Sequence, residues 1–182
     1  NEALATRTYC HNMIMFVYLF CLSITQGGDI LVGHLVGQQR HQAAYVLGNY
    51  FFRWSMVITL TGSALLALAG QSILSAFTDN PDIIAMGVWV LIIDWFLEIG
   101  RTSNIFAVGT LRATGDAIYP VVIAIIFNWS IAVGLSYFIG IPLGFGLVGM
   151  WVGFALDENI RGIILMRRWR SGKWKNKGFV KS

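Results

Sequence analysis

The chain has 182 residues, of which 56% are hydrophobic and 12% charged, and it carries a formal net charge of +4. Its mean hydropathy is +0.65. Since soluble domains average about 25% charged residues, this composition excludes an ordinary soluble protein and predicts one that lies in a membrane.

Apolar stretches long enough to cross a membrane follow one another along almost the whole chain. About 20 apolar residues cross the hydrocarbon core as a helix. We therefore predict an all-α membrane protein with five transmembrane helices, over residues 13–37, 44–70, 83–108, 118–139 and 143–166. Short polar or glycine- and proline-containing segments separate the five stretches.

The ends of the chain differ in character from this transmembrane helical domain, which covers residues 13–166. Residues 1–12 are expected to be the extracytoplasmic end of a missing helix or loop, because the chain begins with Asn1 and shows no signal-peptide pattern. Residues 167–182 form a basic tail that contains seven of the thirteen Lys and Arg residues. The positive-inside rule places this tail in the cytoplasm. We expect a multi-pass protein of the cell membrane.

The third apolar stretch contains three charged residues, Asp94, Glu98 and Arg101. At 100° per residue these positions fall within about 60° of one another, so they form one polar stripe on a helix. A charge near the centre of a bilayer costs roughly 3 kcal/mol, and charges persist there where they face a protein interior or a water-filled path. The stripe is therefore a candidate site for a substrate or a coupling ion.

The last apolar stretch repeats the pattern with Asp157, Glu158 and Arg161. Counted at about 1.5 Å per residue, Glu98 and Asp157 lie at nearly the same depth in the membrane. The first stretch adds two polar residues in that layer, Gln26 and Asp29. The acids on three helices are thus predicted to converge.

A purely structural interpretation of these charges competes with the functional one. Glu98 and Arg101 are three residues apart, and Asp157 and Arg161 are four apart, which are the spacings of local ion pairs that neutralise each other. Asp94 has no basic partner at helical spacing other than Arg101. The sequence leaves both interpretations open.

Three segments resemble the multidrug and toxic compound extrusion transporters: residues 30–40 followed by 43–45, residues 109–116 followed by Pro120, and residues 146–151 with 157–162 and 168–174. They occur in the family's order and spacing. The resemblance implies that the chain is the C-terminal part, roughly helices eight to twelve, of a twelve-helix carrier, and hence an incomplete six-helix C-terminal lobe. Its partners would be the lipid bilayer, the N-terminal lobe and helix seven of the same polypeptide, and small cationic or amphipathic substrates, without nucleic acid.

The same resemblance implies antiport: organic cations or other amphipathic drugs leave the cell in exchange for sodium ions or protons, and no cofactor takes part. In one branch of the family an acid on helix ten occupies the position that is Arg101 here. Asp94 and Glu98 would then be the acids that face the substrate or the coupling ion, with a possible sodium site between them.

The same residues bear on three other functions. A lipid-linked oligosaccharide flippase would offer basic residues to a pyrophosphate, for which Arg53, Arg101 and Arg161 are available, although acids accompany two of them. An intramembrane enzyme is disfavoured because the sequence has no His-Glu-x-x-His pattern, Gly-x-Ser-x-Gly elbow or glycine-rich phosphate loop. A membrane scaffold would not explain acids on three helices at one depth.

Overall fold

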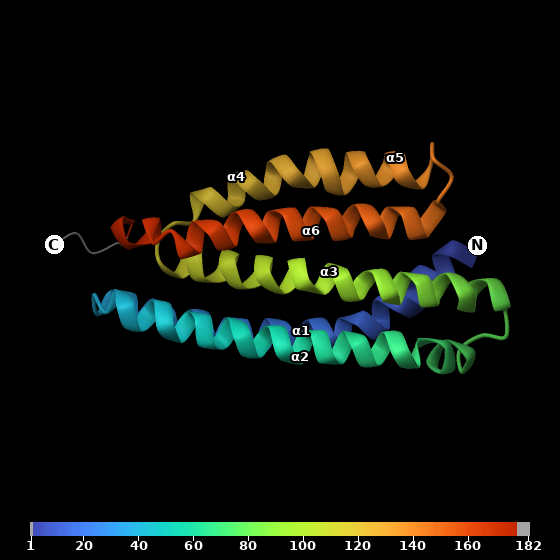
Figure 1. Ribbon diagram of the computed structural model, residues 1–182, viewed down its shortest axis with the longest axis horizontal. Helices are drawn as coiled ribbons and strands as arrows, with labels where there is room; N and C mark the ends of the chain where they lie inside the picture. The colour runs from blue at the N-terminus through green and yellow to red at the C-terminus, as the bar shows by residue number, and fades with distance from the viewer. Residues whose placement is uncertain (1, 178–182) are drawn as a thin grey trace.

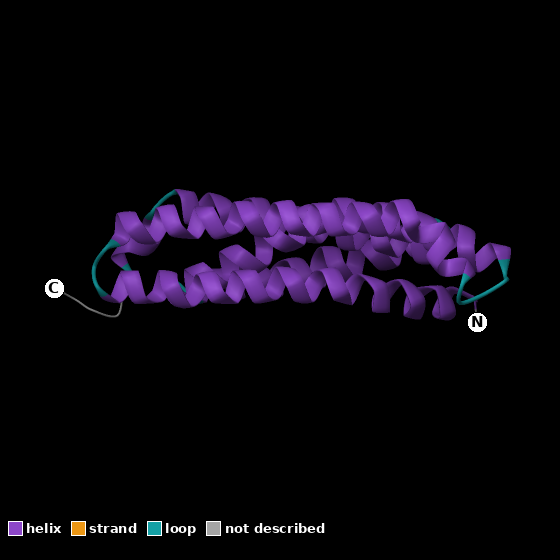
Figure 2. Ribbon diagram, turned by 90° about the horizontal axis from the view of Figure 1, so that it is seen from below, coloured by secondary structure: helices purple, strands orange, loops and turns teal. Residues whose placement is uncertain are grey.

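The computed structural model describes residues 2–177, which fold into an elongated bundle of helices without strands in that range (Figures 1 and 2). In chain order the elements are α1 (Glu2–Gly37), α2 (His41–Ser75), α3 (Pro81–Ala113), α4 (Ile118–Phe127), the π-helical segment η1 (Asn128–Leu135), α5 (Ser136–Gly140), α6 (Gly146–Arg170) and the short 3₁₀ helix η2 (Lys173–Asn176).

These elements make five long rods, because α4, η1 and α5 continue into one another over residues 118–140. The first four rods are long and apolar enough to cross a membrane. The fifth rod, α6, carries the charged residues of the last apolar stretch and lies beside α3 (Figure 1). The predicted all-α membrane fold with five helices is confirmed.

The helix ends differ from the predicted boundaries at both termini. Residues 2–12, expected to be separate from the first span, are continuous with it in α1, since no glycine or proline interrupts them. Cys10 and Met13 lie on the same buried face of that helix. At the other end α6 runs to Arg170, and Trp174 of η2 folds back to stack on Trp169 at 4.7 Å between ring centroids. Residues 178–182 of the predicted tail lie outside the described part.

The third helix is the centre of the bundle. It packs against α1 and α2 on one side and against α6 on the other, while the α4–η1–α5 rod packs on α6 (Figure 1). Its start is set by Asn80, whose side-chain oxygen accepts the backbone N–H of Asp82 at 2.9 Å, with Pro81 in the first turn. Polar residues in the middle of α3, such as Asp94 and Glu98, are therefore buried among other helices, whereas Arg112 near its end is exposed.

Two apolar clusters hold the bundle together at its two ends. One contains Phe106, Leu165 and Trp169, and the other contains Leu74, Leu91 and Trp151. Along α3 they are separated by residues 98–104, a stretch that includes the buried polar residues Thr102 and Asn104. The polar layer thus lies between two dry layers of packing.

The backbones of helices α3 and α6 lie very close together in this polar layer. A Cβ atom at Gly100 would lie 2.6 Å from the Cα of Asn159, and one at Gly162 would lie 2.9 Å from the carbonyl oxygen of Gly100. Glycine at both positions lets the two backbones touch. The two helices that carry most of the intramembrane charge are therefore held side by side.

Candidate functional site

The charged stripe of α3 forms a three-residue ion-pair cluster. Arg101 Nη1 donates to Glu98 Oε1, and Arg101 Nη2 lies 3.4 Å from Asp94 Oδ1. The side chains of Asp94 and Glu98 are 3% and 0% exposed. Asp94 also accepts a hydrogen bond from the indole Nε1 of Trp151 on α6 at 3.4 Å. One guanidinium therefore serves two buried carboxylates.

A matching cluster lies on α6. Arg161 Nη2 is 2.6 Å from Asp157 Oδ2 and 2.8 Å from Glu158 Oε1. The local pairs that the sequence spacing allowed are thus present on both helices. Glu158 is in addition joined to α3, because Asn104 Nδ2 donates to its Oε2 at 2.7 Å.

A small cavity of about 210 Å³ brings the two clusters together. Its charged lining comes from Arg101 of α3 and from Asp157, Glu158 and Arg161 of α6, with Trp151 at its wall. Counted together, the two clusters hold four carboxylates and two guanidinium groups. When all of them are ionised, the pair of clusters carries an excess of two negative charges.

The region where the charged clusters of α3 and α6 meet is called the α3–α6 seam below. Several polar atoms at this seam have no hydrogen-bond partner within the described residues. They are Glu98 Oε2, Asp157 Oδ1, Asn104 Oδ1 and Arg161 Nε, all buried. A buried carboxylate oxygen without a partner is costly unless a proton, an ion or a water meets it. The arrangement can therefore accept a small cation or protons, although residues 2–177 contain no group of three His, Cys, Asp or Glu side chains arranged to hold a metal ion.

The first helix contributes to a neighbouring cavity and not to this one. Gln26 and Asp29 line a space of about 230 Å³ together with Asn104, Gly109 and Arg112. The Asp29 carboxylate packs so closely on Gly109 that a Cβ there would collide with it. The predicted acids therefore do not share one cavity: Asp157 and Glu158 line the first, Asp29 lines the second, and the two predicted acids of α3 line neither. Asn104 connects the two spaces, because it lines the second and is bonded to Glu158 of the first.

Two residues of the seam were not among the predicted site residues. Asn104 and Trp151 each join the two helices, through Glu158 and Asp94 respectively. An asparagine inside an apolar span is itself a usable signal, since its amide needs partners. Trp151 carries no such signal, because tryptophan is common in membrane spans.

The fourth rod reaches the charged cavity through its π-helical segment. Asn128 and Ala132, both in η1, line the cavity opposite α6. π-helical segments are rare and occur frequently at functional sites. The segment therefore places one more polar side chain at the site.

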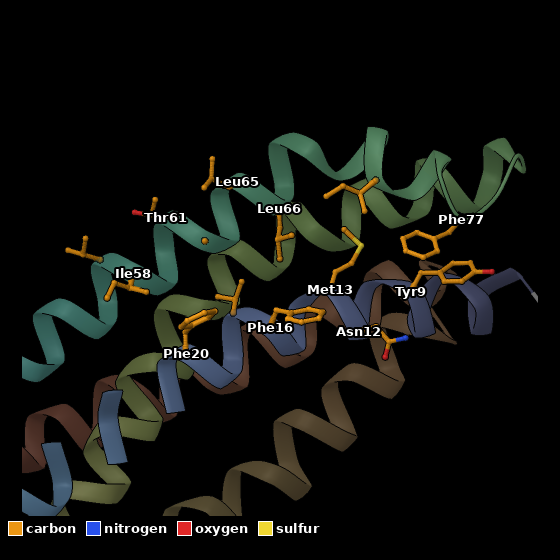
Figure 3. Close-up of a pocket in the computed structure, with 14 residues that line it drawn as sticks. Tyr9, Asn12, Met13, Phe16, Phe20, Ile58, Thr61, Leu65, Leu66 and Phe77 are labelled. Atoms are coloured by element: carbon orange, nitrogen blue, oxygen red, sulfur yellow. The ribbon is translucent and has the colours of Figure 1, made fainter. Parts of the chain in front are cut away.

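A third and larger hollow has no charged residue in its lining. A groove of about 880 Å³ lies between α1 and α2 towards the N-terminal end of α1, and its walls include Met13, Phe16, Phe20 and Leu66 (Figure 3). Its polar lining residues are Tyr9, Asn12 and Thr61.

Comparison with known proteins identifies relatives across almost the whole chain. The sequence model of the MatE family matches residues 1–138. The uncharacterized transporter YisQ of Bacillus subtilis (strain 168) is 41% identical over 98% of this chain. Probable multidrug resistance proteins NorM of Thermotoga maritima and Idiomarina loihiensis are 26% and 24% identical over 98% and 92% of it.

These relatives are much longer than the chain, which spans 39% of the first, 39% of the second and 38% of the third. No solved structure matches the chain.

Proposed function

Because this chain belongs to the MatE family, we propose that the protein containing it exports organic cations or other amphipathic drugs from the cell in exchange for sodium ions or protons. The basic end of α6 would face the cytoplasm, and the N-terminal lobe and helix seven of the polypeptide would complete the pathway. The α3–α6 seam would be the place where substrate and coupling ion compete.

The observation that carries this proposal is the charge balance of the seam. Two guanidinium groups need only two carboxylates, yet four are present. Each additional buried acid costs about 3 kcal/mol or more inside a membrane. A purely structural role would not explain that cost, whereas a site that binds cations or protons requires the extra negative charge.

The mechanism follows from mutual exclusion. Protons or sodium ions bound at Glu98 Oε2 and Asp157 Oδ1 neutralise the seam, and a cationic substrate drawn to the same charges needs those ions to leave. Since the two ligands cannot occupy the charges together, the inward movement of one is linked to the outward movement of the other. Arg101 and Arg161 would balance two of the four carboxylates, so that one or two bound cations are enough to neutralise the remaining negative charge.

The flippase alternative receives less support. Arg101 and Arg161 are held by carboxylates, and Arg53 is exposed on α2 and does not line the charged cavity. The three arginines therefore do not form a common binding site for a pyrophosphate.

The test uses the full-length protein in lipid vesicles. Efflux of an organic-cation dye is measured under imposed sodium or proton gradients for the wild type, Asp94→Asn, Glu98→Gln and Asp157→Asn. We expect each substitution to abolish gradient-driven efflux. The matched control is Asp116→Asn, which also removes a buried acid, but one that lies at the α3–α4 turn and pairs with Arg168 at 2.7 Å.

Efflux that ignores the gradient, or that survives all three substitutions in correctly folded protein, would refute the proposal. An equal loss in Asp116→Asn would show that the effect comes from stability and not from coupling.

A further inference from the structure

A separate groove lies at the basic end of the bundle, on the side where α2, α3 and α6 meet. It has a volume of about 330 Å³. Phe52 of α2, Ile99 of α3 and Ile163 and Met166 of α6 provide its apolar walls. In Figure 1 this is the end at which α2 begins and α6 ends. None of the four acids of the charged seam lines it.

The side-chain hydrogen-bond donors in the floor of the groove already have partners within the protein. Asn159 Nδ2 donates to the carbonyl oxygens of Ala155 at 2.8 Å and of Phe96 at 3.0 Å. Ser103 Oγ donates to the carbonyl oxygen of Ile99 at 2.8 Å. The side-chain donors of the floor are therefore used within the protein, and the apolar walls provide most of the surface that a ligand would contact.

The mouth of the groove is different, because two arginines line it. Arg167 and Arg170 are exposed, and neither forms an ion pair with any acid in residues 2–177. Arg168, between them in sequence, points elsewhere: its Nε is 2.7 Å from Asp116 Oδ2, and its guanidinium lies 4.6 Å from the ring of Tyr119. That hydrogen bond raises the pKa of Arg168. One arginine is thus used within the fold while its neighbours are left for a ligand.

An apolar trough that ends at two unpaired guanidinium groups is complementary to one kind of membrane component. Guanidinium groups bind phosphate through paired hydrogen bonds, and basic pockets between helices at the membrane surface bind anionic lipid head groups. We propose that the groove binds an anionic phospholipid. Arg167 and Arg170 hold its phosphate, and one acyl chain lies between Phe52 of α2 and Ile163 of α6.

The site is independent of the transport proposal and needs only that the helices lie in a bilayer. Lys173 and Lys177, exposed at the same end of the bundle, raise the local concentration of anionic lipid without lining the groove. They therefore supply a matched control, because removing them changes the net charge by the same amount as removing the two arginines.

The experiment measures lipid retained by the full-length protein in detergent, by native mass spectrometry, with phosphatidylglycerol and phosphatidylcholine as probes. We expect the wild type to retain phosphatidylglycerol preferentially, and Arg167→Gln/Arg170→Gln to weaken its binding by about thirtyfold. Lys173→Gln/Lys177→Gln should weaken it by less than about threefold. A second variant, Ile163→Trp, leaves all charges in place and fills the groove, and it should also displace the lipid.

Equal retention of the two lipids by the wild type would overturn the proposal. So would equal losses in the arginine and lysine variants, which would indicate a diffuse electrostatic effect. Unchanged binding in Ile163→Trp, or displacement of the lipid by inorganic phosphate alone at comparable concentration, would show that the groove takes no acyl chain.

Discussion

Membrane helices pack in opposite ways at the α3–α6 seam and at the α1–α2 groove. At the seam, glycines bring two backbones into contact around buried charges. At the groove the walls are uncharged and mostly apolar, and Phe16 and Phe20 remain 71% and 64% exposed. Lipid tails are as apolar as leucine, so an apolar face gains little by being covered, whereas a charge must be enclosed by protein.

The comparison shows which contacts fix the relative positions of the helices. Charged and polar side chains have few acceptable partners, so the seam permits one relative position of α3 and α6. The groove accepts any apolar neighbour, including lipid. Substitutions in the two regions should therefore have very different effects on stability.

The largest effect is expected from Arg101→Gln. This change leaves Asp94 and Glu98 buried without a cation, and removing one partner of a buried ion pair costs about 3–5 kcal/mol. Thermal unfolding of the full-length protein in detergent measures the loss. Adding Glu98→Gln should recover part of it, because one uncompensated charge is then removed. A single variant as stable as the wild type would contradict the enclosed ion-pair cluster.

A smaller effect is expected from Gly100→Ala. The new methyl group would meet backbone atoms of α6, and such overpacking costs about 1–3 kcal/mol. The matched control is Gly27→Ala on α1, where a Cβ meets nothing within 4 Å. There the substitution should be neutral or stabilise the protein by about 0.5–1 kcal/mol, because alanine favours a helix more than glycine does. Equal melting temperatures for the two variants would show that the helices do not touch at Gly100.

The smallest effect is expected from Phe16→Ala in the groove. Because that side chain is 71% exposed and lipid can replace it, the cost should stay below about 1 kcal/mol. The same unfolding measurement applies. A loss of about 3 kcal/mol or more, typical of a truncated core phenylalanine, would show that another protein helix covers the groove and would reduce the contrast between the two regions.

Most of the fold was predictable from local patterns. The lengths of the apolar runs predict five helices, and the three- and four-residue spacings predict the pairs of Glu98 with Arg101 and of Asp157 with Arg161. The continuation of α1 through residues 2–12 was not predicted. The predicted span began where the apolar run begins, and a helix can extend beyond its apolar run into more polar residues.

What the sequence determined by itself is the set of helices, the charges that each one carries and the basic end of the bundle, since these depend on composition and on a repeat of 3.6 residues. Only the tertiary structure decided that Asn104 bonds to Glu158, that Trp151 bonds to Asp94 and that Asp29 lies in a separate cavity. Each of these depends on how far one helix is shifted and rotated against another. Contacts such as that of Gly100 with α6, between residues far apart in the chain, set that register, and no local pattern encodes it.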